Sequence, residues 1–405
     1  MQTSKTWDLL IVGGGPAGLC AAKAAAEKGL SVLVLEKNLE IGSPVHTSGG
    51  SWTRELKAFG IPESFLHPVH HLEFISKRSK AAFHYDFPEI CMLDVHAFYQ
   101  YLAEQASLAG AVIYTNTTVK NPLLEEGKIC GVQAMRNGLP AEYKARIIID
   151  AGGLGGVIAR KMGLRTELAG YGKGAEYEIF TSNWQQDKTA ILLGSDFSPL
   201  GYAWIFPCGK NRVRLGFGVL APQCKDDPLP LLDNFINSDH PLACQLQPYS
   251  IVETHFGSLP NCGYLEKTYA ENLLVCGDAA GHVLSISGEG IRPAMEIGKI
   301  AGTVAAEAIA KNDTSEAFLK RYEARWKRKY ARSIELNTKL NEIIRHYNDT
   351  QWDKVLNILK DVDPAIVLAL MKGYFDLNLL RLILTKNPGL FAHNAMQIVK
   401  KAITG

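Results

Sequence analysis

Residues 9–38 read LLIVGGGPAGLCAAKAAAEKGLSVLVLEKN: an apolar run, a glycine-rich turn, an alanine-rich segment and a second apolar run that ends in Glu36. A buried parallel strand, a tight turn, a helix and a second strand have this pattern. Gly13, Gly15 and Gly18 follow the spacing G-x-G-x-x-G, which, with an acid after the second strand, is the fingerprint of a dinucleotide-binding unit. The stretch therefore predicts a Rossmann-like α/β domain.

Each glycine of this fingerprint has a physical task. Gly13 allows the tight turn, Gly15 lets the backbone approach a pyrophosphate, and Gly18 lets the helix pack on the sheet. The helix N-terminus presents free N–H groups to phosphates, and Glu36 is expected to accept hydrogen bonds from ribose hydroxyls. The residues predicted to bind a dinucleotide here are Gly13, Gly15, Pro16, Ala17, Gly18, Glu36 and Lys37.

The composition is that of a globular protein of two or three domains. Of 405 residues, 47% are apolar and 21% are charged, and the net charge of +2 gives no reason to expect a nucleic-acid partner. The eight cysteines form no C-x-x-C pair or Cys/His cluster, so we expect no metal site and no disulfide framework. This cysteine usage fits a reduced, cytoplasmic compartment. No window approaches the ~18 apolar residues of a spanning helix, so any membrane contact is expected from one side.

The pattern changes along the chain and suggests four segments. Short alternating runs such as YAWIF (202–206) indicate an antiparallel sheet, and residues 272–281 form another strand that ends in a glycine turn. We predict 1–168 as the first part of the nucleotide domain with a substrate-domain excursion near 68–92, 169–268 as a substrate-binding β-sheet domain, 269–312 as the second part of the nucleotide domain, and 313–405 as a helical C-terminal region.

Four segments together resemble the flavoprotein superfamily that includes aromatic hydroxylases of the para-hydroxybenzoate hydroxylase type, and within it the geranylgeranyl reductase family. They are the N-terminal fingerprint with Glu36, IIIDAGGLGGVIAR (147–160), PLGYAWIFPCG (199–209) and CGDAAGHVLSISGEGI (276–291). The resemblance implies a discontinuous Rossmann-like FAD domain of the glutathione-reductase type, an antiparallel substrate sheet and a helical C-terminal region. It also implies FAD as the cofactor.

The segment 276–291 resembles the second FAD signature of that superfamily. By position, Asp278 is the acid that grips the ribityl chain, and Gly288 and Gly290 would let a helix N-terminus approach the isoalloxazine ring. A simple NAD dehydrogenase does not need this second signature. The further FAD-binding residues implied by the resemblance are Gly152, Gly277, Asp278, Gly288, Gly290 and Ile291.

The segment PLGYAWIFP resembles the G-Y-x-W-x-F-P motif of geranylgeranyl reductases. On a strand, Tyr202, Trp204 and Phe206 point to one face, which periodicity alone would interpret as ordinary core. The resemblance instead implies an aromatic wall for an isoprenoid tail, where the π faces of Tyr202 and Trp204 can stabilise developing positive charge.

The chain departs from the family at several positions, of which Thr47 concerns the proton donor and Gly152 favours a reductase over a hydroxylase. Thr47 stands where family members often carry a cysteine, and Gly152 stands where the hydroxylases have a second aspartate. The polar residues left as candidate proton donors are His46, Thr47 and Tyr202, of which His46 is also expected to hydrogen-bond to backbone. With Trp204 they form the predicted catalytic set.

We therefore predict an FAD-dependent reductase of carbon–carbon double bonds in a geranylgeranyl or other polyprenyl lipid. The alternatives are a flavin-dependent monooxygenase or halogenase of the same superfamily and a non-catalytic, lipid-binding flavoprotein-like protein. No second nucleotide fingerprint marks the electron donor, which leaves NAD(P)H and ferredoxin open.

Two stripes in the C-terminal region complete the prediction. Phe318, Tyr322, Trp326 and Tyr330 recur every four residues, a spacing that favours core packing with a solvated basic face over binding to an acidic partner or anionic membrane. The apolar stretches 377–384 and 390–403 allow an amphipathic helix that lies on lipid or covers a substrate tunnel, with peripheral membrane contact in the first case.

Overall fold

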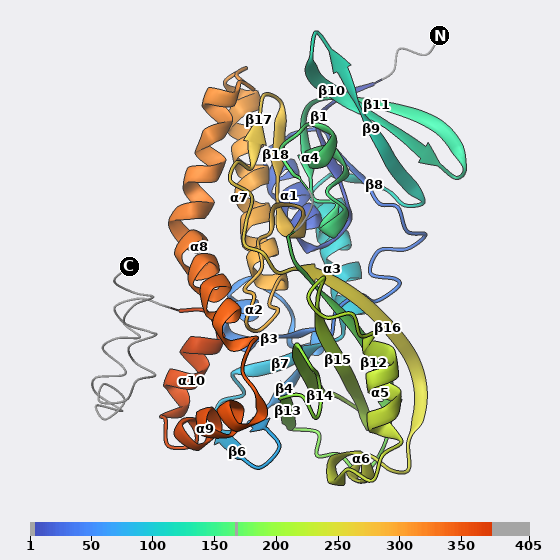
Figure 1. Ribbon diagram of the computed structural model, residues 1–405. Coiled ribbons are helices and arrows are strands. Elements are labelled where there is room, and N and C mark those ends of the chain that lie inside the picture. Colours follow the sequence, from blue (N-terminus) through green and yellow to red (C-terminus); the bar gives the residue numbers. More distant parts are fainter. Residues whose placement is uncertain (1–4, 167–168, 375–405) are drawn as a thin grey trace.

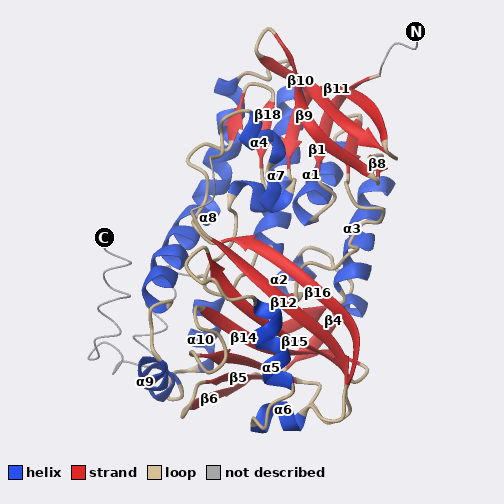
Figure 2. Cartoon of the chain, turned by 45° about the vertical axis from the view of Figure 1, so that its right-hand side comes forward, coloured by secondary structure: helices blue, strands red, loops and turns tan. Residues whose placement is uncertain are grey.

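The computed structural model describes residues 5–166 and 169–374. The chain forms two halves, each built on one large β-sheet, and a long helix runs along one side of both (Figures 1 and 2). The predicted α/β fold with parallel and antiparallel sheets is confirmed.

The first half contains an eight-stranded sheet with a parallel centre. In spatial order its main strands are β17 (Tyr269–Ala270), β18 (Leu273–Val275), β11 (Leu139–Asp150), β1 (Thr6–Val12), β2 (Val32–Leu35) and β8 (Val112–Tyr114). β9 (Thr117–Glu125) and β10 (Lys128–Arg136) extend β11 as an antiparallel meander. The sequence predicted the strand at 145–150, whereas β11 begins six residues earlier because it also pairs with β10.

Helices and the meander cover the two faces of this sheet. Alternate residues along β1 divide between two cores: Leu9 and Ile11 face α1, α3 and α7, while Leu10 and Val12 face the meander and α4. α1 and α7 can approach closely because Gly298 and Gly302 of α7 have no side chains. A Cβ at either position would overlap the backbone of α1. The helical elements of this half are α1 (Pro16–Ala26), α3 (Val95–Leu108), η2 (Gly153–Gly155), α4 (Val157–Lys161), η3 (Gly277–Ala280) and α7 (Ile291–Ala310).

The second half contains a seven-stranded sheet. In spatial order its strands are β16 (Ser250–Pro260), β12 (Tyr171–Phe180), β15 (Arg212–Ala221), β14 (Gly201–Gly209), β13 (Lys188–Leu193), β5 (His71–Ile75) and β6 (Lys80–His84). The pairs within 171–260 are antiparallel, but β13 pairs with β5 in parallel, so the sheet as a whole is mixed. α5 (Pro228–Ile236) and α6 (Pro241–Gln245) cover one of its faces.

A small sheet and the last helices join the two halves. The three-stranded sheet has the order β3 (Gly50–Trp52), β7 (Ile90–Leu93) and β4 (Leu66–Val69), with α2 (Thr53–Ala58) and η1 (Glu63–Phe65) beside it. The last helices are α8 (Glu316–Ile344), α9 (Asp349–Leu359) and α10 (Pro364–Met371). Leu336 of α8, Leu356 of α9 and Ile366 of α10 share one core with β5, β6 and β7.

The aromatic stripe of α8 is core packing. Phe318, Tyr322, Trp326 and Tyr330 are all buried against the first half of the molecule. The stretches 377–384 and 390–403 lie outside the described residues. None of the helices that the structure describes is both long and apolar enough to cross a membrane.

Candidate functional site

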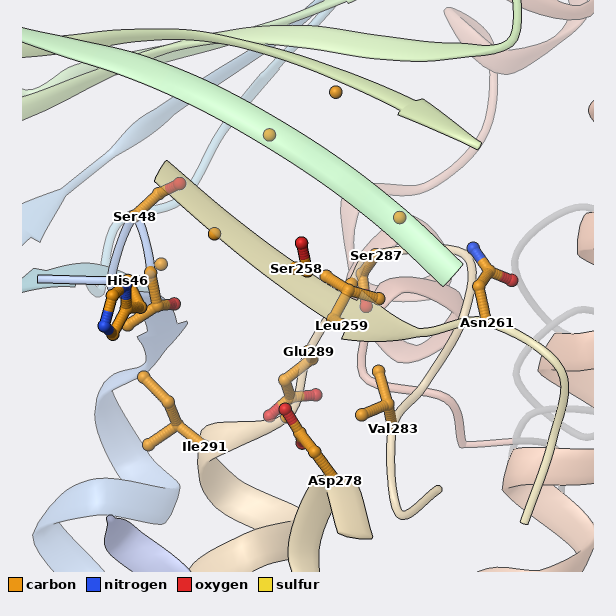
Figure 3. A pocket seen from close by; sticks show the side chains of 18 of the residues that line it. His46, Ser48, Ser258, Leu259, Asn261, Asp278, Val283, Ser287, Glu289 and Ile291 are labelled. Atoms are coloured by element: carbon orange, nitrogen blue, oxygen red, sulfur yellow. The ribbon is translucent and has the colours of Figure 1, made fainter. Parts of the chain in front are cut away.

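One cavity of about 1200 Å³ lies where the two halves meet. Figure 3 shows His46 and Ser48 reaching it from one loop, Asp278, Glu289 and Ile291 from the first half, and Leu259 on β16 between them. Every residue of the predicted dinucleotide and FAD sets lines this cavity except Gly18, and so do His46, Thr47, Tyr202 and Trp204.

The glycines of the turn have different tasks: Gly13 and Gly15 line the cavity, and Gly18 packs the helix on the strand. Gly13 has a φ of +104°, and Gly15 is the N-cap of α1 without any side-chain cap. A Cβ at Gly15 would meet no atom within 4 Å, so this position is open toward the cavity. A Cβ at Gly18 would overlap the carbonyl oxygen of Gly13, which explains why Gly18 packs the helix on the strand and does not line the cavity.

Glu36 braces the turn with both of its carboxylate oxygens. Oε2 accepts the N–H of Gly14 at 2.7 Å, and Oε1 accepts the N–H of Asn38 at 2.8 Å. Because each carboxylate oxygen has two lone pairs, Glu36 keeps capacity to accept ribose hydroxyls.

Asp278 enters the cavity from η3, where Gly277 has a φ of +66°. Among the described residues, none donates a hydrogen bond to its side-chain carboxylate. Burial raises the pKa of Asp278 to about 6, against the opposing charge of Arg165. A half-buried acceptor of this kind fits a hydroxyl-bearing ligand such as the ribityl chain of FAD.

Two other acids near the cavity have protein partners. Asp150 accepts the N–H groups of Gly152, Ile158 and Ala159 and so fixes the start of α4. Glu289 forms a buried, bidentate ion pair with Arg292, with both N···O distances 2.8 Å. Both side chains are buried, so this pair does not face solvent.

The aromatic wall lies on the cavity face of the second sheet. The rings of Tyr202 and Trp204 are 5.7 Å apart, and those of Trp204 and Phe206 are 6.1 Å apart. Tyr202 Oη donates to the carbonyl oxygen of Ser287 at 2.9 Å, and burial raises the pKa of Tyr202 to about 12. The hydroxyl of Tyr202 is therefore protonated near neutral pH, and its proton is engaged by the carbonyl oxygen of Ser287.

An extension of the cavity, which we call the apolar arm, runs from the aromatic wall to the last helices. Its sheet side is formed by Leu72, Phe74, Ile191 and Leu193. Its helix side is formed by Ile344, Trp352, Val355, Leu356, Leu359 and Met371. The cavity therefore has a polar, glycine-rich end and an apolar end, with the aromatic wall between them.

The loop with His46 and Thr47 lies directly on β16. His46 is exposed, and its Nδ1 hydrogen-bonds to the carbonyl oxygen of Phe256 at 2.9 Å. A Cβ at Gly257 would overlap the backbone of His46, so glycine is needed for this close approach.

Sequence reasoning missed Glu176, Gly216 and His255 in the cavity wall or directly behind it. The alternation in EYE (176–178) and ETH (253–255) places the outer residues of each triplet on one strand face, which was the available signal. The pairing of the two strands, which brings Glu176 opposite His255, could not be read from that alternation.

Comparison with known proteins gives matches over nearly the whole chain. Residues 8–185 match the FAD dependent oxidoreductase family, and residues 171–258 match the geranylgeranyl reductase catalytic domain. The chain is 32% identical to digeranylgeranylglycerophospholipid reductase 2 of Methanococcoides burtonii, with 92% of this chain and 93% of that protein covered. It is 34% identical to the enzyme of the same name from Methanothermobacter thermautotrophicus, with 91% and 97% covered.

Solved structures with the same fold match the chain over nearly its whole length. A geranylgeranyl bacteriochlorophyll reductase-like protein from Thermoplasma acidophilum superposes with a TM-score of 0.86 at 27% identity, and 98% of each chain is covered. A p-nitrophenol 4-monooxygenase from Pseudomonas putida has a TM-score of 0.71 at 14% identity, with 94% of this chain and 98% of that chain covered, and shares the fold.

Proposed function

Because the chain belongs to the geranylgeranyl reductase family of FAD-dependent oxidoreductases, we propose that it reduces carbon–carbon double bonds of a geranylgeranyl or other polyprenyl lipid. The observation that carries this proposal is the single cavity that joins a dinucleotide-type turn to an apolar arm across an aromatic wall. A long apolar tail and a dinucleotide cofactor can meet at that wall.

The polar end suits FAD through the chain's own groups. The open position at Gly15 and the uncapped N-terminus of α1 would receive the pyrophosphate, and Asp278 would accept the ribityl hydroxyls. Gly288 and Gly290, which precede α7, would bring its N-terminus to the isoalloxazine ring. When bound, reduced FAD supplies a hydride to one carbon of the double bond.

The apolar arm would hold the prenyl tail and keep water away from the reacting bond. An isolated alkene has no carbonyl oxygen to absorb charge, so its reduction needs a dry site and a nearby proton. The rings of Tyr202 and Trp204 line the cavity beside that site, where their π faces would stabilise positive charge on carbon.

The proposed reaction is tested by mass spectrometry. Enzyme reduced without oxygen should add ~2 Da per double bond to a geranylgeranyl glycerolipid. A product that gains oxygen or a halogen, and forms only in air, would instead support the monooxygenase or halogenase alternative. A purified protein that is colourless and cannot be loaded with FAD would support the lipid-binding alternative.

Two neighbouring residues at the end of α8 test the apolar arm. Ile344 lines the arm, whereas Ile343 is exposed. Ile344→Arg should place a charge among apolar side chains and weaken binding of the prenyl lipid, while Ile343→Arg should leave it intact. Equal lipid binding by the two variants would contradict the location of the tail.

The electron donor and the membrane are further parts of the proposal. NAD(P)H and reduced ferredoxin are the two candidate donors, and anaerobic mixing of each with oxidised holoenzyme identifies the donor by bleaching of the flavin spectrum. We propose that the protein works in the cytoplasm and takes its lipid from one side of a membrane. Co-sedimentation with phosphatidylglycerol vesicles tests that contact.

A further inference from the structure

A row of four in-register residues crosses the cavity face of the second sheet. Trp204 on β14 pairs with Gly216 on β15, which pairs with Glu176 on β12, which pairs with His255 on β16. Because Gly216 has no side chain, the indole of Trp204 occupies the space above it, and Nε1 donates to Glu176 Oε2 at 2.7 Å. The aromatic wall thus ends on a buried carboxylate.

His255 links the buried Glu176 to the more exposed Glu253. Its Nδ1 lies 3.0 Å from Glu176 Oε1, and its Nε2 lies 3.0 Å from Glu253 Oε2. The side chains of Glu176 and His255 are 4% and 7% exposed, whereas that of Glu253 is 47% exposed. Glu176 and His255 both line the cavity, so three side chains connect it to solvent through two hydrogen bonds.

The charges around this row favour a protonated His255. Arg214 donates to Glu178 at 2.9 Å and is held there by the carbonyl oxygens of Ser48 and Leu93. Arg214 Nε also lies 3.9 Å from Glu176 Oε1, and Arg212 pairs with Glu178 and Glu253. The three carboxylates therefore face two guanidinium groups, and the imidazolium of His255 can balance the remaining charge. Burial alone would lower the pKa of His255, but its bonds to Glu176 and Glu253 outweigh burial, and the pKa is raised above its ordinary value.

Other ionisable groups also lie near the row. Glu178, Glu253 and His255 lie close enough to one another to hold a metal ion. The guanidinium group of Arg212 already pairs with both glutamates and supplies a positive charge there. Burial raises the pKa of the Cys208 thiol to about 12, and Nδ1 of His46 is engaged by a backbone carbonyl oxygen.

We propose that His255 and Glu176 form a proton-donating pair for the reaction in the cavity, with Glu253 accepting the Nε2 proton of the imidazolium. The proposal rests on the proposed function, in which each reduced double bond consumes one hydride and one proton. The Nδ1 proton of the imidazolium moves to the carboxylate of Glu176, and the carboxyl group gives it to one carbon as the two π electrons form the C–H bond. The second carbon takes the hydride. The neutral imidazole keeps its Nε2 proton beside Glu253 and takes a new Nδ1 proton from water when the lipid has left the cavity.

Trp204 provides a readout that does not depend on turnover. The chain has six tryptophans, so ¹⁵N-labelled holoenzyme gives six indole N–H signals, and Trp204→Phe assigns one of them. Because Nε1 donates to Glu176, its signal should shift once with pH, at a midpoint above 6.5. The signal of Trp184, which donates to the carbonyl oxygen of Lys188, is the internal control and should stay constant.

Variants separate the relay from a structural role. The Trp204 titration should vanish in His255→Gln, persist in His71→Gln, and move to lower pH in Glu253→Gln, since the imidazolium then loses one carboxylate. Single-turnover alkene reduction should fall ~10²-fold in His255→Gln and Glu176→Gln with flavin content unchanged. The wild-type rate should decline as pH rises through the same midpoint.

Two outcomes would overturn the relay. One is a Trp204 signal that does not titrate; the other is a titrating signal with normal turnover in His255→Gln, which would leave the row a purely structural role. Failure of the proposed function looks different, because wild-type holoenzyme would then reduce no prenyl lipid at any pH while Trp204 still titrates.

Discussion

The indole of Trp204 lies over Gly216 of the neighbouring strand, in space that any side chain at Gly216 would occupy. This relationship lets the ring span β15 and reach Glu176 on β12. The two residues belong to different stretches of sequence, yet the aromatic wall depends on both. A strand glycine therefore shapes the substrate side of the cavity as much as the aromatic residue does.

Gly216→Ala tests this dependence. The added methyl group should displace the indole, break its bond to Glu176 and lower the free energy of unfolding by ~1–3 kcal/mol. Thermal melting measures the stability, and the pH titration of the Trp204 indole signal measures the lost bond. Gly170→Ala is the matched control, because a Cβ there meets only ordinary contacts at 3.6 Å and beyond. Equal stability and equal indole titration in the two variants would contradict the packing of Trp204 over Gly216.

Gly15 and Gly18 separate cofactor binding from folding. Gly15→Val should leave the stability of the FAD-free protein nearly unchanged, since a Cβ at Gly15 meets nothing within 4 Å, but it should abolish FAD binding. Gly18→Ala should destabilise the FAD-free protein, because its Cβ overlaps the carbonyl oxygen of Gly13. Flavin content and melting of the FAD-free proteins measure both effects. Full flavin occupancy in Gly15→Val would refute the pyrophosphate site.

Asp278→Asn should act in opposite directions on stability and on FAD binding. The pKa of Asp278 in the folded protein, about 6, lies above its ordinary value of 3.8, so ionisation destabilises the FAD-free fold increasingly as pH rises from the lower value to the higher one. Asparagine removes this penalty and should stabilise the FAD-free protein by roughly 1–3 kcal/mol at about pH 8, with little effect at about pH 3. At about pH 8 the Asp278→Asn variant should bind FAD more weakly than wild type, because it lacks the carboxylate that accepts the ribityl hydroxyls. A difference in stability between the FAD-free proteins that does not change with pH would argue against a titrating Asp278 with a raised pKa.

The sequence was sufficient for the nucleotide half because its signals are local. The turn at Gly13, the helix from Pro16 and the strand before Glu36 lie within one short stretch, and their geometry follows from the residue types. The meander of β9 and β10 was missed, since its alternation is interrupted by register shifts near Ile129 and Gln133.

The row from Trp204 to His255 could not be predicted because it depends on strand register. Alternation showed that Tyr202, Trp204 and Phe206 share a face, but not that Glu176 and His255 lie across from them. A shift of one residue in any pairing would have turned one of these side chains away from the cavity. The apolar arm depends in the same way on helices more than a hundred residues from the strands that they cover.

The last prediction concerns Lys372, which joins the end of α10 to α2 and to the loop before β7. Its buried Nζ lies 2.9 Å from Glu55 Oε1 and 3.2 Å from Glu89 Oε2. Lys372→Ala leaves these two carboxylates without their shared cation and should cost ~3–5 kcal/mol of stability. Lys80→Ala, which breaks a more exposed ion pair with Glu73, should cost ~0–1 kcal/mol.

The pH dependence of this difference identifies its cause. Burial alone would raise the pKa of Glu55, but the charge of Lys372 and the bonds to Glu55 lower it overall. An acid whose pKa is lowered by folding stabilises the fold fully above its ordinary pKa of 4.5, and this stabilisation is lost as pH falls through the lower pKa of the folded protein. The gap between wild type and Lys372→Ala should therefore be constant near neutral pH and shrink below 4.5. Denaturant unfolding at several pH values measures it, and a gap that does not change with pH would assign the stabilisation to packing of the lysine stem.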